Sequence, residues 1–268
     1  MRRLYITVTL VFLLSAALLA VSTAWNLLSE DRTLPEIQCP ESSLKLSVHA
    51  DESQLLAGVT ASDEKDGDLT DKVFVQDIGK SGQEGMATVT YAVVDSDNHV
   101  ATANREVHYT DYQAPRFSIT QPLHYTVGSP VIIRDRVQAQ DSVDGNISSQ
   151  IRIFSESLSA NMPGVYPVTL EVTNSLGNTA RVTVDVVIEE KTTVSVPKIY
   201  LTDYLVYATA NQEFDASKYL ESVSGGEKVR VRIAMPENGL VSGMNAVTFT
   251  CAGSNGTVGT TILYVVVE

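Results

Sequence analysis

The sequence is poor in the residues that build most catalytic and metal sites. Its 268 residues include four histidines, two cysteines and one tryptophan. The histidines follow no zinc-binding spacing, and neither a His-Glu-x-x-His helix nor a Gly-x-Ser-x-Gly nucleophile turn occurs. A glycine-rich phosphate-binding loop is missing too. These absences predict a protein that is not an enzyme and that carries no organic cofactor.

Basic residues are also scarce. The chain has 19 Lys and Arg against 32 Asp and Glu, which gives a formal net charge of −13. A surface of this sign repels phosphate backbones and anionic membrane surfaces. The sequence therefore predicts no nucleic-acid partner, and the acidic residues are expected to keep the protein soluble.

Long apolar runs are missing as well, with one exception at the N-terminus. Leu4–Trp25 contains 22 residues without a charge, and as a helix it would be about 33 Å long. The hydrocarbon core of a bilayer is about 30 Å thick, so the run is long enough to span it. Arg2 and Arg3 precede the run. By the positive-inside rule this predicts a cytoplasmic tip at residues 1–3, a transmembrane signal anchor at 4–25 and an extracellular remainder.

The same run is also compatible with a cleaved signal peptide. Ser22, Thr23 and Ala24 are the small residues that favour cleavage after Ala24. Cleavage would release the remainder as a secreted protein, whereas an uncleaved helix would hold it as a single-pass protein of the cell membrane. Both interpretations export the rest of the chain.

A period of 79 residues organises the exported part. Gly85, Gly164 and Gly243 are spaced by this distance, and each begins a strand of the same pattern. Apolar and polar residues alternate in short runs between turn residues, which is typical of half-buried strands. A fixed period of this length predicts a tandem array of one small β-domain.

The period divides the exported part into three β-sandwich domains, at residues 33–111, 112–190 and 191–268. The linkers between them are short and lack runs of Gly and Ser, which favours a semi-rigid rod over loosely tethered domains. The third copy is divergent. Within it, the segment 214–223 is expected to form one helical turn with Asp215 as its N-cap.

The repeat also bears on the two cysteines. An exported protein with two cysteines invites a disulfide. Both cysteines, however, take positions at which the other copies have aliphatic residues: Ile119 and Leu201 correspond to Cys39, and Val93 and Val172 correspond to Cys251. Burial as small apolar side chains is therefore the favoured interpretation, and a disulfide is the other.

An acidic segment occurs in the first two copies. The first reads Asp63-Glu-Lys-Asp66-Gly67-Asp68, and the second has Asp141, Asp144 and Asn146 at the same spacing. The simplest interpretation is a turn, because Asp side chains bond nearby backbone N–H groups and Gly supplies a positive φ.

Calcium binding is the second interpretation of this segment. Asp63, Asp66 and Asp68 place three carboxylates within six residues, and hard cations prefer oxygen ligands. An EF-hand would carry a bidentate Glu at its twelfth position, where this chain has Phe74.

The acidic segment, the glycine strand and the turn after that strand together resemble a known group of domains. They are similar to the matching parts of bacterial immunoglobulin-like domains, a group also found in pesticidal crystal proteins. The three parts are the sequence Asp-Gly-Asp-Leu-Thr70, the strand Gly85-Met-Ala-Thr-Val-Thr-Tyr91 and the turn Asp95-Ser-Asp-Asn98. The resemblance covers about residues 35–189. The third copy lacks the Asp-Gly-Asp segment, and its segment 214–219 resembles a related group of bacterial immunoglobulin-like domains. The resemblance implies an all-β chain of three immunoglobulin-like sandwiches on a bacterial surface.

Exposed aromatic side chains are the usual platform of carbohydrate-binding sandwiches. Tyr109, Tyr112 and Tyr125, near the first predicted junction, are candidates, although tyrosines at alternating strand positions more commonly pack within the sheet.

We therefore expect a non-catalytic bacterial cell-surface protein that displays a rod of domains for adhesion, spacing or protein interaction. A carbohydrate or cell-wall binding protein is the alternative, and an accessory subunit of an envelope complex is the second alternative. The expected partners are the membrane, through the N-terminal helix, and an extracellular protein or cell-wall glycan.

Overall fold

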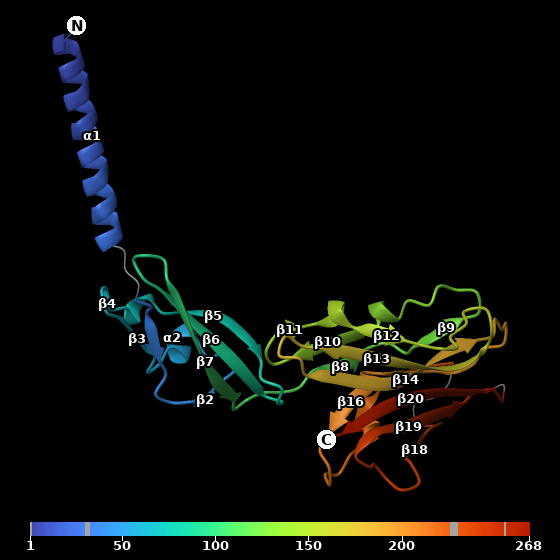
Figure 1. The fold of residues 1–268 in the computed structure, drawn as a ribbon. Helices are drawn as coiled ribbons and strands as arrows, with labels where there is room; N and C mark the ends of the chain where they lie inside the picture. The colour runs from blue at the N-terminus through green and yellow to red at the C-terminus, as the bar shows by residue number, and fades with distance from the viewer. Residues whose placement is uncertain (1, 30–32, 226–229, 255) are drawn as a thin grey trace. The chain divides into compact units, whose positions relative to one another are not determined.

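The computed structural model describes residues 2–29, 33–225, 230–254 and 256–268 (Figure 1). Met1, the first residue of the predicted cytoplasmic tip, lies outside the described residues. One long helix is followed almost entirely by strands, so the predicted all-β class with an N-terminal helix is confirmed. The chain forms two compact units: residues 1–46, 50–81 and 87–108 make the first, and residues 47–49, 82–86 and 109–268 make the second.

The long helix is α1 (Arg2–Ser29). Within the described residues, Tyr5–Trp25 is the single helical stretch long and apolar enough to cross a membrane, a test that a signal sequence also passes. Hydroxyl side chains in it bond to the helix backbone: those of Thr9 and Ser15 donate to the carbonyls of Tyr5 and Phe12, at 2.8 and 2.9 Å. This back-bonding lets hydroxyl side chains sit in an apolar helix without an unpaired donor.

The first unit contains one β-sandwich. One sheet has the order β1 (Glu36–Gln38), β3 (Thr60–Asp63), β4 (Gly67–Asp68), and the other has the order β2 (Ser43–Leu46), β7 (Val100–Tyr109), β6 (Met86–Val94), β5 (Phe74–Lys80). A short helix α2 (Glu52–Leu55) begins with a capping box at Asp51, and a 3₁₀ turn η1 spans Thr70–Lys72. The alternation expected of the glycine strands is seen in β6, where Val89, Tyr91 and Val93 are fully buried, although Ala92 between them is buried as well.

The second unit begins with a sandwich of the same strand order. One set of strands is β8 (Arg116–Ile119), β10 (Val137–Asp141) and β11 (Gly145–Asn146), and the facing sheet is β9 (His124–Thr126), β14 (Thr179–Glu189), β13 (Gly164–Thr173) and β12 (Arg152–Phe154). The 3₁₀ turns η2 (Ile133–Asp135) and η3 (Ser148–Gln150) connect them. The short strand β9 pairs in parallel with the end of β14.

The rest of the second unit repeats this order once more. β15 (Lys198–Leu201) pairs with β17 (Leu220–Ser224), and the larger set of strands is β16 (Leu205–Ala208), β20 (Val258–Val267), β19 (Gly243–Ala252) and β18 (Val231–Ala234). The helical turn predicted here is confirmed: η4 (Ala216–Tyr219) begins after Asp215, whose side chain accepts a hydrogen bond from the Ser217 N–H. Cys251 on β19 is buried as predicted, whereas Cys39, just beyond β1, is only half-buried.

Strands of both copies in the second unit form one seven-stranded sheet, in the order β11-β10-β8-β16-β20-β19-β18. The joint is the pairing of Leu205 on β16 with Ile119 on β8. The boundary predicted between residues 190 and 191 therefore lies inside this unit, between β14 and β15.

Candidate functional site

The first acidic segment forms a tight turn between β3 and β4. Asp63 is buried at the end of β3, and its Oδ1 accepts hydrogen bonds from the N–H groups of Lys65 at 2.8 Å and Asp66 at 2.9 Å. Gly67 follows with a φ of 72°, a conformation that side chains disfavour. Two backbone donors thus converge on one carboxylate oxygen, as the turn interpretation requires.

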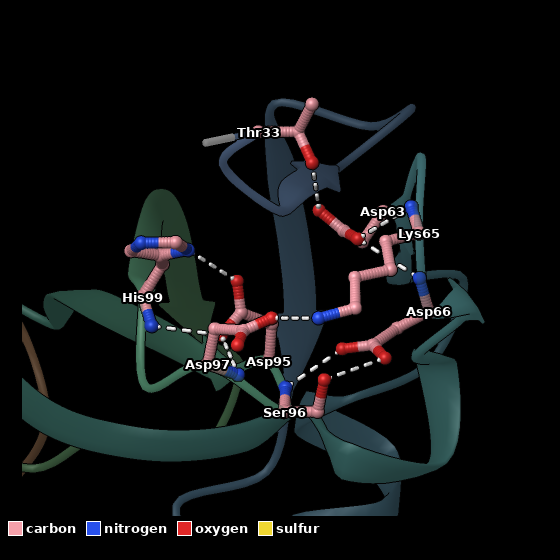
Figure 2. Close-up of polar contacts among 8 residues, drawn as sticks. All are labelled: Thr33, Asp63, Lys65, Asp66, Asp95, Ser96, Asp97 and His99. Carbon is pink, nitrogen blue, oxygen red and sulfur yellow. Dashed lines mark hydrogen bonds and ion pairs between the residues drawn. The ribbon is translucent and has the colours of Figure 1, made fainter. Parts of the chain in front are cut away.

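Asp66 ties this turn to the hairpin turn of the opposite sheet. Its two carboxylate oxygens accept hydrogen bonds from the N–H of Ser96 at 2.7 Å and from the Ser96 hydroxyl at 2.8 Å (Figure 2). These two bonds from Ser96 lower the pKa of Asp66, with a smaller contribution from nearby lysines. Lys65 forms an ion pair with Asp97 beside them. The segment is therefore a clamp between the two sheets of the sandwich.

Asp95 organises the hairpin turn itself. Its side chain is fully buried, and its Oδ1 accepts from the N–H groups of Asp97 and His99 at 2.9 and 2.8 Å. The His99 Nδ1 lies 2.8 Å from Oδ2 of the same carboxylate. Burial alone would raise the pKa of Asp95, but the hydrogen bonds from His99 and Asp97 outweigh it and lower the pKa.

Asp68 points elsewhere. It is exposed, and its Oδ1 accepts from the N–H of Thr70 at 2.9 Å, at the start of η1. Bonds from Thr70 also lower the pKa of Asp68. Among the described residues, no three His, Cys, Asp or Glu side chains gather as a group that could hold a metal ion. The structure thus places Asp63, Asp66 and Asp68 on one turn but aims their carboxylates at separate backbone donors.

The second acidic segment repeats the clamp. Asp141 Oδ1 accepts from the N–H groups of Val143 and Asp144 at 3.1 and 2.6 Å. Asp144 accepts from the N–H and hydroxyl of Ser175 at 2.6 and 2.7 Å. The side-chain amide of Asn174 then donates to Asp141 Oδ2 at 2.5 Å. The partners Ser96 and Ser175 were not singled out from the sequence, although the repeat places them 79 residues apart.

The three candidate tyrosines pack against protein groups. Tyr125 is 7% exposed, its hydroxyl donates to the Ile132 carbonyl at 2.9 Å, and the Arg136 guanidinium lies 4.2 Å from its ring centre. Tyr112 is half-buried and donates to Asn178 Oδ1 at 2.6 Å. Tyr109 is half-buried as well, and burial raises its pKa. None of the three side chains is therefore highly exposed.

A polar hollow lies instead on the sheet of β12 and β13. Gln150, Arg152, Glu171, Val172 and Thr173 line it. The carboxylate of Glu171 pairs with Arg181 from β14, and its Oε1 lies 3.9 Å from Arg152. Both guanidinium groups remain largely exposed, so they could also meet a polar ligand.

Paired sheets, hairpin-connected strands and a clamp between the sheets define an immunoglobulin-like β-sandwich. Residues 43–108 match the family model described as "Bacterial surface protein, Ig-like domain". The resemblance inferred from the sequence is thereby confirmed for residues 43–108, which include most of the first sandwich.

A curated relative supports the same assignment. The pesticidal crystal protein Cry22Aa of Bacillus thuringiensis is 30% identical over 125 residues, which is 45% of this chain and 17% of the crystal protein. The chain therefore corresponds to less than a fifth of that relative's length.

Two solved structures show distant similarity. One contains the M60 catalytic domain and two CBM51 domains of Clostridium perfringens ZmpB, at 11% identity and a TM-score of 0.27, covering 84% of this chain and 37% of that one. The other is mouse cadherin-23 EC22–24, at 16% identity and a TM-score of 0.20, covering 88% and 99%. At these scores neither similarity bears on function.

The bacterial surface domain and the apolar N-terminal helix, as a signal anchor or a signal peptide, are together consistent with an extracellular domain.

Proposed function

We propose that the chain is a non-catalytic bacterial cell-surface protein whose exported immunoglobulin-like domains bind or space other molecules outside the cell. The observation that carries the proposal is the order of its parts. A domain of the bacterial surface-protein type follows directly after an apolar N-terminal helix. Export of everything after this helix accounts for both features.

The helix is proposed to stay in the membrane as a single-pass anchor. Its apolar stretch of 21 residues matches the thickness of a bilayer core. The hydroxyl of Thr23 donates to the carbonyls of Leu19 and Ala20, each at 3.0 Å, so it needs no partner outside the helix. Arg2 and Arg3 favour a cytoplasmic N-terminus.

The non-catalytic role is supported by how the acidic side chains are used. Asp63, Asp66 and Asp95 accept hydrogen bonds from turn backbones and from Ser96. Carboxylates that hold turns in this way stabilise the domain and leave it to act through its surfaces.

Protease treatment of intact cells tests this proposal. We expect an added protease that cannot cross the membrane to digest the chain after residue 33, and the mass of the purified protein to retain residues 1–24. A matched variant with Arg2 and Arg3 changed to Glu should lose part of this exposure, because the charge bias that sets orientation is reversed. Full protection of the wild-type chain in intact cells would contradict export. A secreted product that begins at Trp25 would overturn the anchor and keep the export.

A second candidate function is binding of a cell-wall glycan, favoured by the hollow beside Arg152 and Arg181. Polar side chains with exposed guanidinium groups suit hydroxyl and carboxylate groups of a sugar. Sedimentation of the full chain with purified peptidoglycan tests it. We expect Arg152→Ala to weaken the binding and Arg134→Ala, outside the hollow, to leave it unchanged; no sedimentation of the wild-type chain would dismiss the candidate.

A further inference from the structure

The junction within the second unit carries an inference beyond the proposed function. We propose that residues 112–268 fold and unfold as one cooperative unit, in which backbone pairing and two tyrosine hydroxyls clasp the two sandwiches in a fixed mutual position. Domains joined in tandem usually move relative to each other unless their interface is extensive. Four sets of contacts oppose such motion here.

The first set is a backbone ladder that runs from one sandwich into the other. The Tyr204 N–H donates to the Ile119 carbonyl at 2.7 Å, and the Tyr204 carbonyl accepts from the Tyr264 N–H at 2.9 Å. Leu205 continues this pairing opposite Ile119. Residue 204 thus links β8 of one sandwich to β20 of the next.

The second set consists of tyrosine hydroxyls that cross the junction. The hydroxyl of Tyr264 accepts from the Asp185 N–H at 2.8 Å, and that of Tyr207 accepts from the Phe117 N–H at 2.9 Å. Strand β9 covers β14 only at Val187–Glu189, so Asp185 lies beyond the end of that pairing. Each hydroxyl therefore supplies a backbone donor of the neighbouring sandwich with its acceptor.

Arg116 adds a third contact at the end of the shared sheet. Its guanidinium lies 4.9 Å from the Tyr207 ring centre and forms an ion pair with Glu268, which follows β20. A cation over the face of an aromatic ring is attracted to it. The arginine of β8 is therefore held by two residues of the other sandwich.

The end of the connecting segment is anchored to the third copy. The Thr257 hydroxyl donates to the Ser195 carbonyl at 3.0 Å. A Cβ added at Gly259 on β20 would meet the Pro197 carbonyl oxygen at 1.9 Å. The end of the segment therefore lies directly on β20, at a position that only glycine can fill.

The interface between the two sandwiches is closely packed. Ile119 and Leu123 from one and Tyr204 and Leu205 from the other belong to a single buried cluster. A cavity of about 30 Å³ remains between them, which is room for about one water molecule. A ligand that contacts both sandwiches would therefore bind a preformed surface, and little conformational entropy would be lost on binding.

Hydrogen exchange of the full chain in detergent tests the coupling. Val168→Ala, in the core of β13, should lower the protection of amides in β19 and β20 by the same factor as in β13 and β14. The matched change Val89→Ala, at the corresponding core position of the first unit, should lower protection in β6 and β7 alone. If β19 and β20 keep their full protection in Val168→Ala, the two sandwiches unfold separately and the proposal is wrong.

A second set of variants tests the clasp itself. The double change Tyr207→Phe and Tyr264→Phe keeps both rings and removes both acceptors. In this background, Val168→Ala should again lower protection in β13 and β14. The factor by which it lowers protection in β19 and β20 should be at least about tenfold smaller. Tyr204→Phe is the control, because its hydroxyl accepts from Leu201 N–H within its own sandwich, and it should leave the coupling intact. Unchanged coupling in the double variant would overturn the role of the hydroxyls.

Discussion

The two hairpin turns that face the acidic segments have the same backbone hydrogen bonds but different charge. In the first, the carboxylate of Asp95 is held by His99; in the second, Asn174 and Asn178 stand at the corresponding places. In both turns a side-chain oxygen accepts a hydrogen bond from the backbone N–H four residues later. Asp95 accepts from His99 at 2.8 Å, and Asn174 accepts from Asn178 at 2.9 Å. The clamp therefore needs a hydrogen-bond acceptor at this position, and the side chain that supplies it is a carboxylate in one copy and a neutral amide in the other.

The amide makes one contact that the carboxylate cannot make. Asn174 donates its Nδ2 to Asp141 Oδ2, whereas ionised Asp95 has no hydrogen to offer to Asp63. In the first copy Asp63 Oδ2 instead accepts from the Thr33 hydroxyl at 3.3 Å. The first clamp thus contains two buried carboxyl side chains, whereas the second pairs one half-buried carboxyl with an amide.

Removing the buried turn carboxylate should have the largest effect. We expect Asp63→Ala to destabilise the first unit by about 1–3 kcal/mol, because two backbone N–H groups lose their acceptor in a buried place. Chemical unfolding followed by hydrogen exchange in β6 measures it. Asp141→Ala, where the residue is only half-buried, should cost the second unit less. Equal losses would mean that burial of Asp63 is unimportant.

The next largest effect should be a difference between the two units in how acid lowers their stability. The folded pKa values of Asp66 and Asp95 lie below the usual 3.8, so their contribution to stability is present above about pH 4 and is lost as pH falls through the folded values. We expect the midpoint temperature of thermal unfolding to fall more steeply with pH for the first unit than for the second below about pH 4.

The double change Asp95→Asn and His99→Asn copies the second turn into the first. It should flatten this acid dependence, because residue 95 would no longer titrate and could donate to Asp63 as Asn174 does to Asp141. An unchanged pH profile in the double variant would show that the dependence arises elsewhere.

Loss of the hydroxyl that crosses between the sheets should have a smaller and equal effect in both copies. Ser96→Ala and Ser175→Ala each remove one donor to an aspartate and keep the backbone bond. We expect about 1 kcal/mol or less for each in chemical unfolding. A loss confined to Ser96 would indicate that the two clamps are not equivalent.

Local patterns in the sequence were enough to predict the strands, the helix and the turn residues. Alternation predicted that strands such as β6 bury one face, and the Asp-x-x-Asp-Gly spacing placed Asp63 at the head of a turn, because these features depend on near neighbours. The pairing of Asp66 with Ser96 spans 30 residues and depends on how two sheets face each other, which a local pattern does not encode.

Two further features escaped prediction for physical reasons. The joint between β8 and β16 is made by backbone groups, and these look the same in every sequence. Arg105, 2% exposed, sits where the second copy has Val184. It bonds the carbonyls of Glu41 and Ala57, whereas an arginine within an alternating strand would be expected on the exposed face.

The smallest expected effect concerns calcium, and it tests most directly the claim that both acidic segments are turns whose carboxylates already have protein donors. Thermal unfolding of the full chain should show the same midpoint for the first unit in excess Ca²⁺ and in chelator. A rise of about 4 °C or more with Ca²⁺, which for a domain of this size corresponds to about 1 kcal/mol, would contradict the claim if Asp66→Asn abolished it.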